Sequence, residues 1–167
     1  MEIRKSHLDD VQRIMTLIHQ AQNYFKQQNI DQWQDGYPQS LDIIEDIQKN
    51  NSYVIEDHDI IGTMYFAIED EPTYQKIQGQ WLTHHKPYAV IHRIVVDENH
   101  KGQNIAHQLL EYAIHECQQN HIHSIRIDTH EDNLSMQRFL QKHGFHQCGE
   151  ITLLSGDLRI GFEKILE

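Results

Sequence analysis

The stretch VVDENHKGQNIAHQLL, from Val95 to Leu110, decides how this chain is organised. It ends a β-branched apolar run, continues through a polar turn, and passes into apolar residues at helical spacing. The first turn of such a helix has backbone N–H groups without partners and the positive end of the helix dipole, and both favour phosphate. Gly102 and the small Ala106 allow close approach to that backbone, and Lys101 adds a cation. An ordinary connection with a solvated loop remains the alternative interpretation.

Strands and helices alternate outward from this stretch. The segment AVIHRIVV (Ala89–Val96) predicts a strand whose apolar run is interrupted by His92 and Arg93. Further strands are predicted at Met1–Lys5, Ser52–Glu56, Ile60–Glu69 and Ser124–Thr129, with a closing hairpin of Gln147–Leu154 and Leu158–Ile165. Helices are predicted from Leu8, from Leu41, from Ile105 to Cys117, and over Leu134–His143. This order indicates an α/β chain with a mixed sheet and helices on its faces.

Length and charge limit the classes of function. The 167 residues suit about one domain, so we expect residues 1–167 to form a single domain. Lys and Arg number 14 against 25 Asp and Glu, and the net charge of −11 disfavours nucleic acid and suits a cationic partner such as an amine. No apolar run is long enough for a membrane span, and the first residues lack a signal core. Two cysteines fit a reducing compartment, so we expect a cytoplasmic protein.

Two blocks together resemble the GNAT superfamily of N-acetyltransferases. The first has Lys101, Asn104 and Ala106 where the family signature reads Arg/Gln-x-x-Gly-x-Gly/Ala. The second, IRIDTHEDNLSMQRFLQKHGF, matches the later family block at positions that include Asn133, Met136, Phe139, Leu140, Gly144 and Phe145. The pattern VIHRI, followed by IDTH-x-x-N-x-x-MQ, is similar to that of a bacterial subgroup of this superfamily. The resemblance implies the GNAT fold, a mostly antiparallel splayed sheet of about seven strands with helices on both faces. It also implies acetyl-coenzyme A, bound in the splay, as cosubstrate.

The resemblance assigns cofactor-binding residues. Backbone groups around Ile94, Val95 and Val96 would bind the pantetheine arm, with Asn133 on its other side. The pyrophosphate would bind the turn and helix start, namely Lys101, Gly102, Gln103, Asn104, Ile105, Ala106 and His107. Lys101 and Asn104 depart from the signature, but Lys keeps a cation and Asn tolerates unusual backbone angles. Leu140 stands where many members have the Tyr that protonates the departing thiolate.

Acetyl transfer to an amine needs a group that removes the amine proton. His92 is the candidate base, because it lies on the strand that would face the thioester, four residues before Val96, as in the arylalkylamine N-acetyltransferases. A histidine satisfied within the sheet is the alternative. Candidate substrate residues are Trp33, Tyr37, Glu69, Tyr88, Asp128 and His130. For each of them, packing or a solvated turn is the plainer interpretation.

Three further expectations complete the sequence-based interpretation. The 14 histidines lack partners at convincing ligand spacing, so we expect no metal. Apolar positions in the final hairpin, and the tendency of the superfamily to pair, predict a homodimer. A non-catalytic acyl-coenzyme A sensor or docking module is the alternative function, because Leu140 cannot donate a proton.

Overall fold

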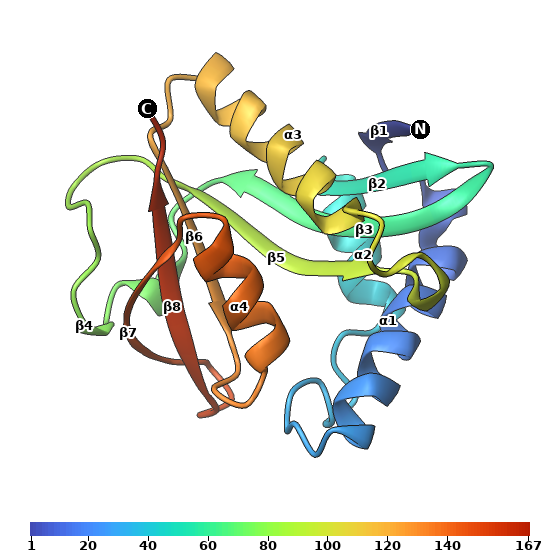
Figure 1. Ribbon diagram of the computed structural model, residues 1–167, viewed down its shortest axis with the longest axis horizontal. Helices are drawn as coiled ribbons and strands as arrows, with labels where there is room; N and C mark the ends of the chain where they lie inside the picture. Colours follow the sequence, from blue (N-terminus) through green and yellow to red (C-terminus); the bar gives the residue numbers. More distant parts are fainter. The chain divides into compact units, whose positions relative to one another are not determined.

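The structure is a computed structural model that describes all residues from 1 to 167. Figure 1 shows the path of the chain through four helices and eight strands. The helices are α1 (Val11–Gln27), α2 (Ser40–Gln48), α3 (Ile105–Gln119) and α4 (Leu134–Lys142). The strands are β1 (Glu2–Lys5), β2 (Ser52–Asp57), β3 (Asp59–Ile68), β4 (Gln78–Gly79), β5 (Ala89–Val96), β6 (Ser124–Thr129), β7 (His146–Thr152) and β8 (Leu158–Ile165).

The strands form one mixed sheet in the order β1-β2-β3-β5-β6-β8-β7-β4. β5 and β6 pair in parallel, Ala89 with Ile125 and Val90 with Arg126, whereas the pairs β1–β2, β2–β3, β6–β8, β7–β8 and β4–β7 are antiparallel. The predicted mixed sheet is therefore confirmed. The strand beyond the expected seven is β4, which is two residues long. Gln78-Gly79 carries no apolar alternation that could have predicted it.

The chain folds into two compact units, each assembled from two separate stretches. Residues 1–66 and 92–113 form unit 1, and residues 67–91 and 114–167 form unit 2. β3, β5 and α3 contribute residues to both units. The expectation of a single domain stays a prediction.

Unit 1 has helices on both faces of its strands. Val54 of β2 packs with α1 and α2 in a buried apolar cluster that also contains Ile14, Leu17, Ile18, Ile43, Ile60 and Val95. Its neighbour Ile55 faces the other way, as alternation in a strand requires. On that second face Gly62 of β3 leaves so little room that a Cβ would lie 2.8 Å from Ile55 and 3.1 Å from Ile105 of α3. The missing side chain of Gly62 is what lets α3 pack closely on the strands.

The helix predicted from Leu8 begins with a 3-10 turn, and α1 itself starts at Val11. Leu8–Asp10 forms a 3-10 turn, and the backbone N–H of His7 donates to the Asp10 carboxylate at 2.7 Å. Ser6 instead pairs its hydroxyl with Ser52 of β2 at 2.8 Å, so it fixes the strand rather than the helix.

Unit 2 is held by a buried carboxylate, Glu163 of β8. Its side chain accepts hydrogen bonds from the backbone N–H groups of Leu82 (2.6 Å) and Thr83 (3.3 Å) and from the hydroxyls of Thr83 and Ser124. Arg126 of β6 pairs with the same carboxylate at 3.3 Å.

The guanidinium of Arg126 also stacks on two aromatic rings. It lies 4.3 Å from the ring centroid of Trp81 and 4.0 Å from that of Tyr88. Burial alone would raise the pKa of Glu163, but its donors and Arg126 outweigh burial and lower it. The connection between β4 and β5 is therefore fastened to the sheet by charge-assisted contacts.

The final hairpin divides its apolar residues between core and surface. Ile151 and Phe162 are fully buried, whereas Leu154, in the turn, is 97% exposed. The outer neighbour of β7 is β4, which pairs with it only at Gln78 and Gly79. The homodimer expected through this hairpin stays a prediction. No helix has the length and apolar character that crossing a membrane requires.

Candidate functional site

The turn from Lys101 to Asn104, which we call the helix-start turn, links β5 to α3. Gly102 and Asn104 have φ angles of +81° and +61°, in the left-handed region that glycine and asparagine tolerate best. A Cβ built on Gly102 would meet no atom within 4 Å, so the backbone there faces open space. The N–H of Gln108 donates to the carbonyl of Asn104, and the amides just ahead of it are those that a helix leaves without an intrahelical partner. The turn therefore suits an anionic group.

A buried carboxylate, Asp97, holds the base of the helix-start turn. It accepts hydrogen bonds from Gln20 of α1 at 3.1 Å, from Arg13 of α1 at 3.2 Å and from the backbone of Asn99, and it lies 3.0 Å from Nδ1 of His100. Its own N–H donates to the carbonyl of Ile61 in β3. These contacts fix the exit of β5 to both α1 and β3.

The charges and side-chain directions around the helix-start turn follow from its neighbours. Burial alone would raise the pKa of Asp97, but Gln20, His100 and Arg13 lower it below the usual range. The Lys101 ammonium lies 4.5 Å from the ring centroid of Tyr24 on α1, a cation–π contact at the surface. Val95 is buried in the core, so alternation directs Ile94 and Val96 to the other face of β5.

Arg93 is the centre of a second cluster in unit 1, here called the Arg93 cluster: Tyr37, Asp46, Tyr65, His92 and Arg93. Its guanidinium, with 12% of the side chain exposed, donates to the Asp46 carboxylate of α2 and to the Tyr37 hydroxyl. It also stacks on the rings of Tyr37 at 5.8 Å and Tyr65 at 5.3 Å. The His92 ring lies 5.4 Å from the Tyr65 ring. The candidate base and one candidate substrate residue therefore meet around Arg93.

Burial dominates the electrostatics of the Arg93 cluster. It raises the pKa of Asp46, and the neighbouring Arg93 only partly offsets that rise. Burial likewise raises the pKa of Tyr37, so this phenol stays protonated at neutral pH. The cluster therefore places the raised pKa values of Asp46 and Tyr37 beside the Arg93 cation.

The other candidate substrate residues make structural contacts. Trp33 lies edge-to-face on Phe25 of α1, 5.7 Å between centroids, and packs on the unit 1 core. In unit 2, the Tyr88 hydroxyl donates to Asp70 at 2.7 Å and accepts from the N–H of Glu71 at 2.8 Å. Asp128 accepts a 2.6 Å hydrogen bond from Tyr74. The structure therefore describes packing for Trp33, and hydrogen bonds together with the stacked Arg126 for Tyr88.

The end of β6 and the start of α4 carry three more predicted positions. Nδ1 of His130 accepts from the N–H of Asp132 at 3.0 Å, and Asn133 caps α4 by accepting from the N–H of Met136 at 3.2 Å. Leu140 is fully buried in α4. Glu69 lies half-buried just after β3.

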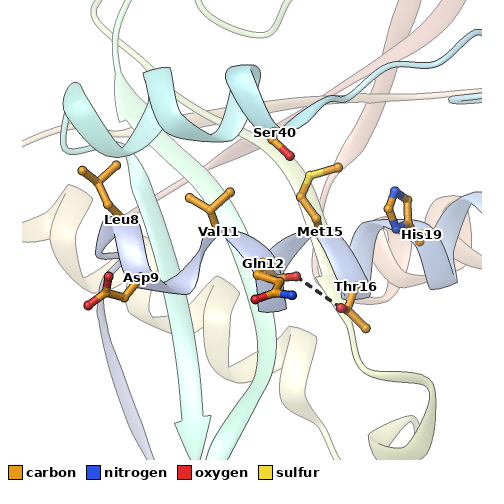
Figure 2. A pocket seen from close by; sticks show the side chains of 8 residues that line it. All are labelled: Leu8, Asp9, Val11, Gln12, Met15, Thr16, His19 and Ser40. Atoms are coloured by element: carbon orange, nitrogen blue, oxygen red, sulfur yellow. Dashed lines mark hydrogen bonds between the residues drawn. The ribbon is translucent and has the colours of Figure 1, made fainter.

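An open groove of about 500 Å³ between α1 and the start of α2 contains none of the predicted residues. Figure 2 shows its lining, which is Leu8, Asp9, Val11, Gln12, Met15, Thr16, His19 and Ser40. No three His, Cys, Asp or Glu side chains gather where they could hold a metal ion.

The sequence-based interpretation missed several residues around Asp97 and in the Arg93 cluster. Asp97, Gln20 and Arg13 had no local signal, since two of them lie on the polar side of a helix remote in sequence. Asp46 and Tyr65 likewise had no local signal in the sequence. Arg93 did carry a signal, because a charged residue inside AVIHRIVV is unusual in a strand with buried neighbours.

The family model for acetyltransferases (GNAT) matches residues 18–145 of the chain. The chain belongs to the GNAT family. A GNAT acetyltransferase from Streptococcus agalactiae has 33% sequence identity and a TM-score of 0.90, over 99% of this chain and 95% of that one. A putative acetyltransferase from Staphylococcus aureus has 25% identity and a TM-score of 0.77, with both chains fully covered. This GNAT protein is therefore an acyl-transferring enzyme.

A more distant structure was solved with a ligand. The putative acetyltransferase yncA from Salmonella typhimurium, with its cofactor acetyl-CoA, has 15% identity and a TM-score of 0.68, over 100% of this chain and 94% of that one. At that identity it shows the shared fold. A search of the curated proteins finds no match to this GNAT chain.

Proposed function

We propose that this GNAT enzyme transfers an acetyl group from acetyl-CoA directly to a primary amine of a small molecule or peptide. The observation that carries the proposal is the helix-start turn, where the backbone of Gly102 faces open space and the amides that follow lie at the start of α3, ahead of its first intrahelical hydrogen bond. That arrangement fits the pyrophosphate of coenzyme A. Lys101 would add its charge to the same group.

The remaining cofactor contacts follow from the family. Backbone groups of Ile94 and Val96 would bind the pantetheine arm, and the amides from Lys101 to His107 would bind the pyrophosphate. Asn133 would reach the arm from the start of α4. Metal is not part of the proposal, and the acyl donor brings the activated thioester itself.

His92 is the proposed base. The amine nitrogen, once neutral, forms the new C–N bond with the thioester carbon as the C–S bond breaks, and the amine proton passes to the His92 imidazole directly or through water. A strand N–H of β5 would stabilise the developing oxyanion. Glu69, Asp128 and His130 are proposed to line the acceptor path, as are Trp33, Tyr37 and Tyr88.

Coenzyme A is proposed to leave as the thiolate. Leu140 is apolar and fully buried, so this position supplies no proton. A thiol with a pKa of about 8.5 is a tolerable leaving group at neutral pH. The same leucine supports the alternative function, a non-catalytic acyl-CoA sensor or docking module.

Thiol release from acetyl-CoA with a panel of primary amines and short peptides tests the proposal. We expect amine-dependent release well above hydrolysis, and mass spectrometry should find the acetyl group on the amine nitrogen. Binding of coenzyme A in a titration, with no turnover of any amine, would favour the sensor.

The proposal also covers the location and the assembly of the enzyme. Two free cysteines fit the reducing cytoplasm. The exposed Leu154 and Leu158 of the last hairpin would contribute to a homodimer. Light scattering at tens of micromolar protein should give the dimer mass, and a monomer mass would contradict it.

A further inference from the structure

Arg93 breaks the regular alternation of β5. Its φ of +49° makes it the one non-glycine residue inside a strand with a left-handed backbone. In a regular strand His92 and Arg93 would point to opposite faces. Here both side chains contact the ring of Tyr65, His92 at 5.4 Å and Arg93 at 5.3 Å. The strained residue thus brings a cation beside the proposed base, and strain of this kind concentrates at functional sites.

The Arg93 cluster has hydrogen-bond donors to spare. Nη1 and Nη2 of Arg93 donate to Tyr37 and Asp46, but its buried Nε–H has no acceptor in the structure. The Tyr37 hydroxyl uses its oxygen to accept from Arg93, so its hydrogen remains to be donated. A buried donor that lacks an acceptor is costly, which favours a ligand oxygen nearby.

The charges of the Arg93 cluster also limit the acceptor. The Arg93 cation and the Asp46 anion offset one another, so the cluster offers no surplus negative charge for a second ammonium group. A polyamine would place a cation next to a guanidinium, and like charges at short range repel. An amine that carries an oxygen close to its nitrogen would instead use the spare donors.

We infer that Arg93 and Tyr37 form a subsite for a carboxylate or carbonyl oxygen adjacent to the reacting amine, which makes α-amino acids or their amides the preferred acceptors. The inference rests on the proposed acetylation of amines. Its ligand chemistry is common to free amino acids, which offer a carboxylate, and to peptide N-termini, which offer a carbonyl.

Matched acceptors test this subsite on the full-length enzyme. We would compare kcat/KM for leucine, leucinamide and 3-methylbutylamine, for the corresponding phenylalanine series, and for spermidine. Hydrogen bonds to charged groups predict a preference of about 10- to 100-fold for the oxygen-bearing acceptor. Preference for the free acid identifies the carboxylate, and preference for the amide identifies a peptide-like carbonyl.

Two variants assign the preference to the subsite. Arg93→Gln should bring the ratio between oxygen-bearing and plain amine close to one. Tyr37→Phe keeps the Arg93–Asp46 pair and serves as the test if Arg93→Gln fails to fold. It should lower the ratio about threefold or more. Tyr112→Phe on α3 also removes a tyrosine hydroxyl and should keep the wild-type ratio.

Three results would overturn the inference. They are equal use of plain and oxygen-bearing amines, preference for spermidine, or a preference that survives both variants. Acetyl-CoA binding without turnover of any amine would contradict the proposed function as well, so the two failures are distinguishable.

Discussion

The helix-start turn and the Arg93 cluster lie in the same compact unit, yet they differ in what they are made of. The turn offers backbone amides, set by Gly102, Asn104 and the first residues of α3. The Arg93 cluster is made of side chains from β5, α2, β3 and the loop after α1. A backbone site depends on a few consecutive residues, whereas a side-chain site depends on the whole fold. That difference suits the roles proposed for them, a constant cofactor at the turn and a variable acceptor at the Arg93 cluster.

The largest expected effect is on the acceptor side. His92→Ala should lower kcat/KM by about 100- to 10,000-fold, because the amine proton would lose its base. Acetyl-CoA affinity, measured by calorimetry, should stay within a few-fold. His19→Ala on α1, in the groove of Figure 2, is the matched control and should retain activity. An active His92→Ala enzyme would make His92 a sheet residue.

Asp97→Asn is expected to have the opposite effect, a loss of acetyl-CoA affinity with little change on the acceptor side. The amide keeps only one accepting oxygen and no charge, so the contacts of Arg13, Gln20 and His100 weaken, and the helix-start turn should loosen. We expect the KM for acetyl-CoA to rise about tenfold, at nearly constant kcat and acceptor KM. Steady-state kinetics with each substrate varied would measure this.

The control for this variant is Asp9→Asn, at an exposed position in the groove. It should behave as wild type. A loss of kcat alone in Asp97→Asn would contradict a role in positioning the turn.

A smaller effect is expected for Ala106→Val in the first turn of α3. The extra methyl groups would crowd the amides that we assign to the pyrophosphate, and affinity for coenzyme A should fall about three- to tenfold. Thermal stability should change little, since a β-branched residue in a helix costs only about 0.5 kcal/mol. Gln118→Val, exposed near the end of the same helix, also places a β-branched residue in α3 but should keep the wild-type affinity for coenzyme A. Equal coenzyme A affinity in both variants would remove the phosphate assignment.

The pKa values of Asp46 and Asp97 should be shifted in opposite directions. The pKa of Asp97 is lowered, so its stabilising contacts persist until the pH falls well into the acid range. The pKa of Asp46 is raised by burial, so its ionised form costs stability at neutral pH, and that cost is relieved as the pH falls through the raised value. Carbon-detected NMR of the carboxyl groups should find Asp46 above, and Asp97 below, the usual value of about 3.9. The opposite order would reverse the comparison.

The sequence predicted the parts of the molecule that local patterns determine. The strand Ala89–Val96 and the start of α3 at Ile105 agree with the predicted bounds, as do β6 and the second strand of the final hairpin, and β1 begins one residue after the predicted Met1. Gly102 and Asn104 have the left-handed backbone that their residue types favour. These features need only a few neighbouring residues.

Features that depend on remote residues were not predictable. Nothing local reveals that Asp46 of α2 and Tyr37 would meet Arg93, or that Arg13 and Gln20 would meet Asp97. Trp33 and Tyr88 look like candidate pocket aromatics in the sequence, whereas the structure gives them packing contacts on Phe25 and Arg126. One-dimensional patterns do not distinguish an aromatic ring that lines a pocket from one that fills a core.

The buried Glu163 has a consequence for the exchange of amide hydrogens with solvent. Leu82 and Thr83 lie outside regular secondary structure, where amides ordinarily exchange rapidly. Their N–H groups nevertheless donate to a carboxylate with no exposure. Exchange at these two positions requires the break of a charge-assisted contact in the interior of unit 2. The loop before β5 should therefore exchange in step with the strands β6 and β8, as part of their cooperative unit rather than as a surface loop.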